Sequence, residues 1–281
     1  MEVTIGDHLD VQSAEAYIEQ WLQAKKATGT SSGTLSRYGP VLQRFLESLP
    51  EKRRRVSIAS ITALEVEPFR NTELEAGKTP GTANFAVKVL RAVFKTARRR
   101  GLCPINPAEA VEMLPEVSEE RLPFLEDQVK DLIAVAENEW RGMILLGYHT
   151  GIRSSDAANL TWANVDLLNR ILVFRARKTA GRTKAAQKDS VVYMHADLVS
   201  YFASLPASDD THAPIFPGLY RKTPGSHGGL SNGFGRLMHL AGIRAPLGPE
   251  KRGKGRQFKA LGFHSLRHSF RSWVTSSRSS S

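Results

Sequence analysis

Apolar residues in the first 115 positions recur at helical spacing and are separated by short polar segments. Four stretches have this pattern, and they begin near Ser13, Leu35, Thr62 and Thr79. Thr79 precedes a proline, and Thr62 with Glu65 has the form of a capping box, so both positions predict helix N-termini. Pro40 lies in the second stretch, where we expect it to kink or restart the helix.

The second half combines apolar helical segments with two short runs of strand-like composition. An amphipathic helix is expected over 124–136, and the apolar segment 143–148 follows it. The runs 171–174 and 190–194 flank a basic, turn-rich segment, which predicts an antiparallel hairpin with a long connection. Residues 195–240 are expected to be helical with loops. The predicted fold class is therefore mainly α with a small antiparallel β-sheet.

A charged, helix-breaking connector over 116–121 separates the two halves. We place the domain boundary there, which gives domains of 1–115 and 116–281. The 281 residues carry a formal net charge of +11, of which 116–281 contribute +8. An excess of this size favours a polyanionic partner such as nucleic acid. A soluble protein that merely happens to be basic is the alternative explanation.

Cysteine content and hydropathy bear on the compartment. Cys103 is the single cysteine, so neither an intramolecular disulfide nor a cysteine-based zinc site is expected. The N-terminus lacks the basic and apolar regions of a signal peptide, and no apolar run approaches the ~18 residues of a membrane span. We therefore expect a cytoplasmic protein that acts neither on a membrane nor on a small-molecule substrate.

The helix expected after Thr79 has one basic face opposite an apolar stripe. The basic face is formed by Lys88, Arg91, Lys95 and Arg98, and the stripe by Ala86, Leu90, Val93 and Ala97. No acidic residue is interleaved with these four cations, although surface helices usually mix charges of both signs. We interpret the basic face as a DNA-binding surface. A solvated basic face without a partner is the alternative.

Three separate segments carry residues suited to phosphate chemistry. They contain Arg153, Lys178, and the pair His264 and Arg267. Two arginines can bond the non-bridging oxygens of a phosphodiester, and a lysine or histidine can donate a proton to the leaving alkoxide. Such a site needs no metal and no cofactor, because fixed cations supply the charge stabilisation. Taken singly, each residue has an ordinary structural explanation.

In their order and spacing, these segments resemble the motifs of the tyrosine recombinases, the phage integrase family. Thr-Gly-Ile-Arg153, with Asp156 three residues later, resembles the first arginine motif of that family. Arg177-Lys178-Thr179 stands where the family has its hairpin lysine, and His264-Ser-Leu-Arg267 resembles its His-x-x-Arg box. The first half is similar to the core-binding domain of the family, including the segments 82–84 and 106–108.

The resemblance implies a helical core-binding domain over 1–115 and a mixed catalytic domain over 116–281, which would hold DNA between them. It also implies DNA integration or recombination through a 3′-phosphotyrosyl intermediate. Arg153 and Arg267 would bind the scissile phosphate, Lys178 would be the general acid, and His264 would assist proton transfer. Asp156 would support Arg153. The implied partners are double-stranded DNA and further copies of the chain, in a nucleoid-associated cytoplasmic complex of a mobile element.

The chain departs from the family pattern after the His-x-x-Arg box. The family continues with a histidine or tryptophan and then the nucleophilic tyrosine, whereas the last tyrosine here is Tyr220. We expect no nucleophile in this chain, which leaves its DNA strand-transferase activity open. Three classes follow: a recombinase incomplete for cleavage, a non-catalytic DNA-binding remnant or regulator at recombination sites, and a type IB-like topoisomerase.

Two other patterns are weaker matches to different chemistry. The segment 248–255 nearly has the form of a P-loop, but no Ser or Thr follows Lys254 and no apolar strand precedes it. His264 and His268 have the i,i+4 spacing of zinc ligands, but no third ligand accompanies them. We assign no metal site.

Overall fold

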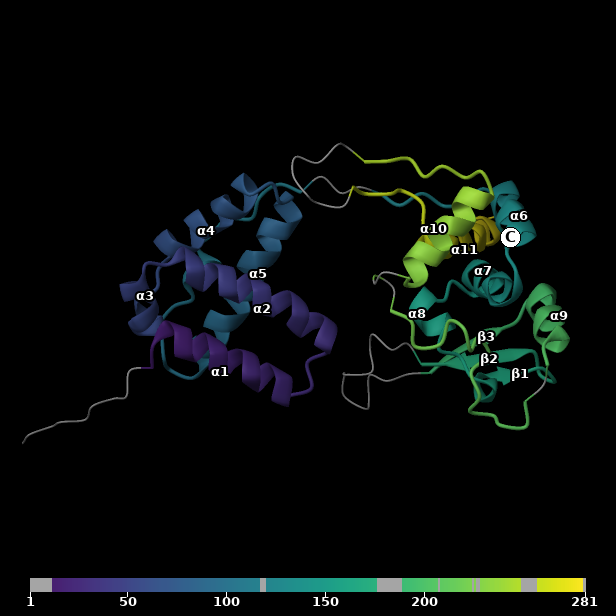
Figure 1. Cartoon of the computed structure of the whole chain (residues 1–281), viewed down its shortest axis with the longest axis horizontal. Coiled ribbons are helices and arrows are strands. Elements are labelled where there is room, and N and C mark those ends of the chain that lie inside the picture. Colours follow the sequence, from purple (N-terminus) through teal and green to yellow (C-terminus); the bar gives the residue numbers. More distant parts are fainter. Residues whose placement is uncertain are drawn as a thin grey trace, which may run out of the picture. The chain divides into compact units, whose positions relative to one another are not determined.

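The computed structural model describes residues 12–116, 120–175, 189–206, 208–223, 225, 228–248 and 257–279. These residues form two compact units, one before and one after the segment 117–119. Each unit has its own hydrophobic core. Helices dominate both, and three short strands form one antiparallel sheet (Figure 1), which confirms the predicted fold class.

The first unit is a set of helices whose ends are fixed by capping side chains. Its α-helices are α1 (Ala14–Ala27), α2 (Ser32–Ser48), α3 (Glu51–Arg55), α4 (Ala63–Glu75) and α5 (Pro80–Arg99), and its 3₁₀ turns are η1 (Ile58–Ser60) and η2 (Pro107–Glu109). Ser13, Thr62 and Thr79 each accept a backbone N–H of the following turn, which confirms the helix N-termini predicted at Thr62 and Thr79. These caps satisfy amide groups that have no partner within the helix.

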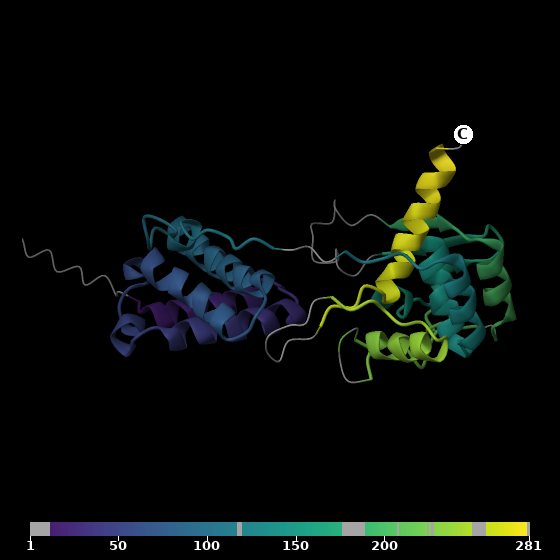
Figure 2. The same ribbon diagram turned by 90° about the horizontal axis from the view of Figure 1, so that it is seen from above.

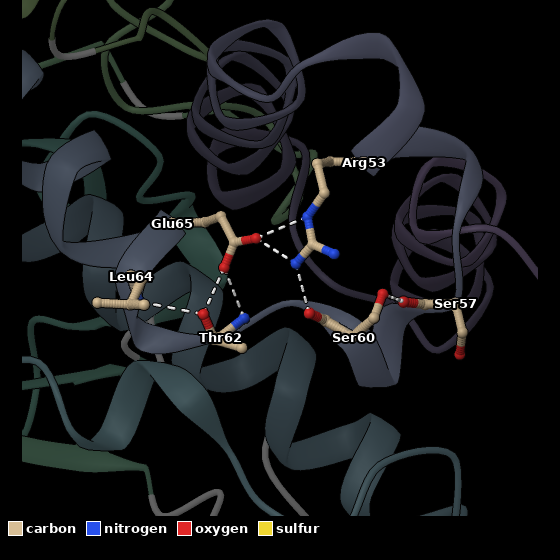
Figure 3. A network of polar contacts seen from close by, with 6 residues as sticks. All are labelled: Arg53, Ser57, Ser60, Thr62, Leu64 and Glu65. Atoms are coloured by element: carbon tan, nitrogen blue, oxygen red, sulfur yellow. Dashed lines mark hydrogen bonds and ion pairs between the residues drawn. The ribbon is translucent and has the colours of Figure 1, made fainter.

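The capping box at the start of α4 also ties this helix to α3. The Glu65 carboxylate accepts the Thr62 backbone N–H at 2.8 Å and the Thr62 hydroxyl at 2.6 Å. The same carboxylate pairs with the Arg53 guanidinium, which also donates to the carbonyl of Ser60 (Figure 3). The network lowers the pKa of the Glu65 carboxyl, against the raising effect of its partial burial. Through Glu65, the capping box of α4 therefore also forms a contact with α3.

The apolar stripe of α5 is buried in the core of the first unit, as its spacing predicts. Trp21 of α1 packs in the same core, and its indole N–H donates to the Thr96 hydroxyl of α5 at 3.0 Å. Phe45 of α2 meets Phe69 of α4 edge to face, with 5.3 Å between ring centroids. Aromatic contacts of this kind join all four longer helices into one unit.

We expected Pro40 to kink or restart the second helix, and the structure shows that the helix does not restart there. Pro40 lies inside α2, which continues to Ser48. Proline removes one backbone hydrogen bond at this point, but Val41, Leu42 and Phe45 directly after it are buried. Burial of this apolar face outweighs the lost bond, because each fully buried aliphatic or aromatic side chain contributes about 1.5–3 kcal/mol.

In the described part of the second unit, α-helices and a sheet pack around a separate core. The helices are α6 (Glu126–Val135), α7 (Asn138–Thr150), α8 (Ser154–Ala157), α9 (Ala196–Ser204), α10 (Leu230–Leu240) and α11 (Phe263–Ser279). The strands are β1 (Val165–Asp166), β2 (Ile171–Phe174) and β3 (Ser190–Tyr193), with the 3₁₀ turn η3 (Trp162–Asn164) before β1. Figure 2 shows the last turns of α11 extending beyond the neighbouring elements of this unit.

The predicted hairpin is confirmed, because β2 and β3 are antiparallel, with Leu172 opposite Val192. The sequence pattern missed β1, whose two residues pair with the other edge of β2, Val165 opposite Leu172. A strand of two residues is too short to show alternation along the sequence. Leu172 is fully buried, so the centre of β2 anchors the sheet on the core.

Helix α7 is the central element of the second unit and contacts α6, α8, α9 and α11. Its segment from Gly142 to Gly147 is buried on all sides. Gly147 allows α11 to approach closely, since a Cβ there would lie 2.8 Å from Cδ1 of Leu266. Among the described residues, no helix combines the length and apolar character needed to cross a membrane.

Candidate phosphate-binding site

Arg153 is placed by the way α7 ends. Gly151 has a φ of 63°, in the left-handed region, and its N–H bonds to the Gly147 carbonyl at 3.1 Å. This geometry is a common helix stop and favours glycine. The chain then leaves α7 in an extended conformation, and Arg153 becomes the N-cap position of α8. Its side chain is 38% exposed, so its guanidinium remains accessible to a ligand.

Asp156 lies one turn further along, at the buried side of α8. Its carboxylate is 3.9 Å from the Arg153 guanidinium, and the aspartate is only 5% exposed. A buried carboxylate at this distance restricts the orientation of the arginine side chain. The structure therefore brings these two predicted residues together in the geometry expected for a supporting acid.

His264 and Arg267 reach the same region from α11. Phe263 and Leu266 are buried against α7, which leaves His264 exposed and Arg267 half-buried on the neighbouring face of the helix. Arg267 donates from Nη1 to the Gly151 carbonyl at 2.7 Å. The His-x-x-Arg box is thus fixed to the turn that precedes Arg153, although 116 residues separate the two partners of this bond.

The packing between α7 and α11 depends on glycine at two positions. In addition to the contact at Gly147, a Cβ on Gly151 would lie 2.8 Å from Cδ1 of Phe270. Both glycines precede Arg153, and Gly151 also ends α7. The residues that permit the close approach of α11 therefore also set the position of Arg153. Their role was not visible from the sequence, because it depends on a helix that follows more than a hundred residues later.

The electrostatics of the site reflect its excess of cations. Burial and the nearby Arg153 lower the pKa of Arg267, whose guanidinium remains charged. Partial burial lowers the pKa of His264 below its ordinary value of 6.5, and His268, Arg121, Arg267 and Arg153 add to this shift. His264 is therefore neutral at pH 7. A bound anion would offset the repulsion between these cations and raise the pKa of His264.

Arg121 is a neighbour of this site that sequence reasoning missed. Its positive charge acts on His264, and its guanidinium lies 5.5 Å from the centroid of the Phe258 ring. In the sequence it is the last residue of a charged connector, and no motif distinguishes it from the other charges there. The Leu122 N–H bonds to the Ala260 carbonyl at 3.1 Å, which shows that this segment runs beside the start of α11.

Lys178 and most of the P-loop-like segment 248–255 lie outside the described residues. The last described positions on either side of the hairpin connection are joined by an ion pair. In it, Nε of Arg175 lies 2.8 Å from Oδ1 of Asp189. The role of Lys178 as the general acid stays a prediction.

The four cations of α5 have different environments. Arg91 donates to the carbonyls of Ala108 and Val111 at 2.9 and 2.7 Å, so it holds the segment after α5 in place. Arg98 pairs with Glu109 at 3.0 Å, and Lys88 lies 3.9 Å from a carboxylate oxygen of Glu116. Lys88, Lys95 and Arg98 are exposed. The acids that balance this face come from the following segment and not from the helix itself.

Two arginines and a histidine lie at the junction of α7 and α11, and residues of these types are suited to bind an anion. The model of the phage integrase family matches residues 123–279, which is more than half of the chain and contains this site. The chain belongs to the phage integrase family.

Curated relatives share about a quarter of their residues with the chain. Tyrosine recombinase XerC of Lactobacillus leichmannii is 25% identical over 190 residues, covering 64% of this chain and 58% of XerC. Tyrosine recombinase XerA of Thermococcus onnurineus is 26% identical over 206 residues, covering 71% of this chain and 65% of XerA. The chain therefore spans less than two thirds of the length of these relatives.

A solved structure with a similar fold is lambda integrase (residues 75–356), determined as a dimer bound to a COC′ core site. It aligns with a TM-score of 0.63 at 18% identity, covering 92% of this chain and 88% of the other. The Tn1549 transposon integrase in complex with transposon right end DNA aligns with a TM-score of 0.64 at 17% identity, covering 93% and 87%. At these identities the likeness shows the fold.

Proposed function

We propose that this chain acts in site-specific DNA recombination and supplies the phosphate-binding part of a strand-transfer site. The observation that carries the proposal is the fixed juxtaposition of the two arginine motifs, in which Arg267 is bonded to the turn that presents Arg153. Two guanidinium groups near one another repel, and the Asp156 carboxylate offsets one of their two charges. A ligand that carries negative charge would offset the other.

In this proposal the ligand is the scissile phosphate of duplex DNA. Arg153 and Arg267 bond its non-bridging oxygens and stabilise the charge that develops in the transition state. His264, neutral at pH 7, can accept a proton from an attacking hydroxyl or share one with the phosphate. Asp156 orients Arg153, and Lys178 protonates the leaving 5′-oxygen.

None of the six tyrosines is proposed as the nucleophile. Burial, with a contribution from Glu139, raises the pKa of Tyr201 to about 12, and its hydroxyl donates to the Asn138 carbonyl at 3.2 Å. Tyr17 is buried in the core of the first unit. These two tyrosines are not available to attack a phosphate. A chain without a nucleophile would fit a second candidate function, a non-catalytic DNA-binding regulator that occupies recombination sites.

The proposed partners are double-stranded DNA and further copies of the chain. Lambda integrase, which has the same fold, is described as a dimer on a COC′ core site and as a tetramer on a Holliday junction. We extend duplex binding and assembly on DNA to this chain, in a complex associated with the nucleoid.

The test uses a duplex that the protein itself selects from a random pool. We expect the 281-residue chain to bind this duplex and to form no covalent adduct with a nicked suicide version of it, as judged by denaturing electrophoresis. A catalytic site needs an oriented nucleophile to use its bound phosphate. Failure to select any duplex would contradict the proposal. A stable adduct would show that a side chain of this protein attacks the phosphate, and mapping the linked residue would identify it.

A fusion separates the two candidate functions. Appending the tyrosine-bearing C-terminal segment of a relative should create the covalent adduct if the chain retains a strand-transfer site. The same fusion with the nucleophilic tyrosine replaced by phenylalanine is the control. Retained duplex binding without an adduct in the active fusion would favour the DNA-binding regulator.

A second prediction concerns the basic face of α5. Replacing Lys88 and Lys95 together with alanine should lower the slope of log Kd against log salt by roughly 1–2, because each phosphate contact releases a counterion. Arg91 is left intact, since its bonds to two carbonyls give it a structural role. The control replaces the exposed Lys26 and Lys52 on other helices, which removes the same charge. Equal salt slopes in the two variants would mean that the basic face of α5 is a solvated surface without DNA contacts.

A further inference from the structure

Three potential metal ligands meet beside α7, outside the phosphate-binding site. His149 lies in the last turn of α7, His195 is the N-cap of α9, and Asp197 lies in the first turn of α9. One nitrogen of each histidine and one carboxylate oxygen all lie within 4.8 Å of one another. The sequence analysis missed this group, because 46 positions separate the two histidines and no spacing motif connects them.

Two of the three separations already match a coordinated metal. Nε2 of His149 lies 3.2 Å from Oδ2 of Asp197, and Nδ1 of His195 lies 3.3 Å from the same oxygen. Bonds of 2.0–2.2 Å in tetrahedral geometry place neighbouring ligand atoms about 3.4 Å apart. The carboxylate oxygen therefore lies at a suitable distance from either nitrogen to share one ion.

Nδ1 of His195 has two polar neighbours at the start of α9. It lies 3.3 Å from the backbone N–H of Asp197, which it accepts, and 3.3 Å from Oδ2 of the same residue. A cation beside these atoms would be attracted by the carboxylate and by a nitrogen lone pair.

The surroundings provide room for a cation. All three side chains line one cavity of about 600 Å³, which can also admit a water ligand. The partial negative charge at the C-terminal end of α7, where His149 lies, is offset by the partial positive charge at the N-terminal end of α9, so the attraction for a cation comes from the Asp197 carboxylate. Lys130 lines the same cavity, but its ammonium is 3.0 Å from the carboxylate of Glu126.

We propose that His149, His195 and Asp197 bind a divalent transition-metal ion of the zinc type. Two neutral imidazoles and one carboxylate are a ligand set that such ions prefer, with water in the fourth position. The rings of the two histidines are stacked 5° from parallel, with 4.2 Å between centroids. His195, about half exposed, turns its ring on binding so that its nitrogen points at the ion.

The bound ion ties the end of α7 to the start of α9. His149 is four residues before Arg153, so the metal fixes the turn that presents the first arginine motif. The site stands independently of the proposed function, because binding of the ion requires neither DNA nor a nucleophile.

The test is a titration of the untagged chain with Co²⁺, whose visible absorption reports tetrahedral coordination, and with Zn²⁺ by calorimetry. We expect one equivalent to bind and to raise the melting temperature. His195→Asn should weaken binding by about 10-fold or more, while asparagine still caps α9. Its melting temperature in EDTA should equal that of the parent protein, which separates ligand loss from misfolding.

His268→Gln is the matched control, because His264 and His268 form the competing i,i+4 pair. Unchanged affinity in this variant supports the proposed site. Absence of stoichiometric binding would overturn the inference. So would binding that survives in His195→Asn or disappears in His268→Gln.

Discussion

Replacing Arg267 by alanine is expected to weaken binding to the selected duplex roughly 10- to 100-fold at constant salt. A hydrogen bond to a charged group contributes about 1.5–3 kcal/mol, and each 1.4 kcal/mol is a factor of ten in Kd. The guanidinium is half-buried and held by the Gly151 carbonyl, so it meets a phosphate with little loss of side-chain entropy. Arg153→Ala should have an effect of similar size. Filter binding or fluorescence anisotropy measures both.

Two further variants separate an organised site from general charge. Arg267→Lys keeps the positive charge but loses the planar fork, so it should recover only part of the affinity. Arg170→Asn removes an exposed arginine from the β1–β2 turn and keeps a residue that tolerates the φ of 55° there. This control should change Kd by about twofold or less. Equal losses in Arg153, Arg170 and Arg267 variants would mean that no organised phosphate site exists.

The largest expected effect on stability comes from Leu266→Ala, which should lower the free energy of unfolding of the second unit by about 2.7–5 kcal/mol. Leu266 of α11 is fully buried against Gly147 of α7, so the shorter alanine side chain leaves a cavity in the contact between the two helices. Urea unfolding followed by tryptophan fluorescence in a Trp21→Phe background measures the loss, because Trp21 lies in the core of the first unit and Trp140 packs on Phe234 in the second.

Leu240→Ala is the control for this stability prediction. Leu240 ends α10 and is 67% exposed, so the same chemical change there should stay within about 0.5 kcal/mol. Comparable losses in the two variants would show that the α7–α11 contact does not stabilise the unit. A loss confined to Leu266→Ala, together with weaker duplex binding, would show that this packing also positions Arg267.

Local interactions made much of this fold predictable. Caps at Ser13, Thr62 and Thr79 satisfy backbone groups within a few residues, and the apolar stripe of α5 has the period of a helix. Both features depend only on residues close together in the sequence. The β2–β3 hairpin was predictable for the same reason. Pro40 shows the limit of local reasoning, because tertiary burial of the residues after it keeps α2 continuous.

For the candidate site, the sequence by itself determined the residue types and their order, and hence the family resemblance. The tertiary structure decided what those residues contact. Arg91 resembled its basic neighbours along α5, yet carbonyls 17 and 20 residues away make it a structural tether. The bond from Arg267 to Gly151 and the group of His149, His195 and Asp197 likewise join positions distant in sequence. Periodicity and capping report on neighbours within one or two turns, whereas such contacts exist only once α7 has packed against α9 and α11.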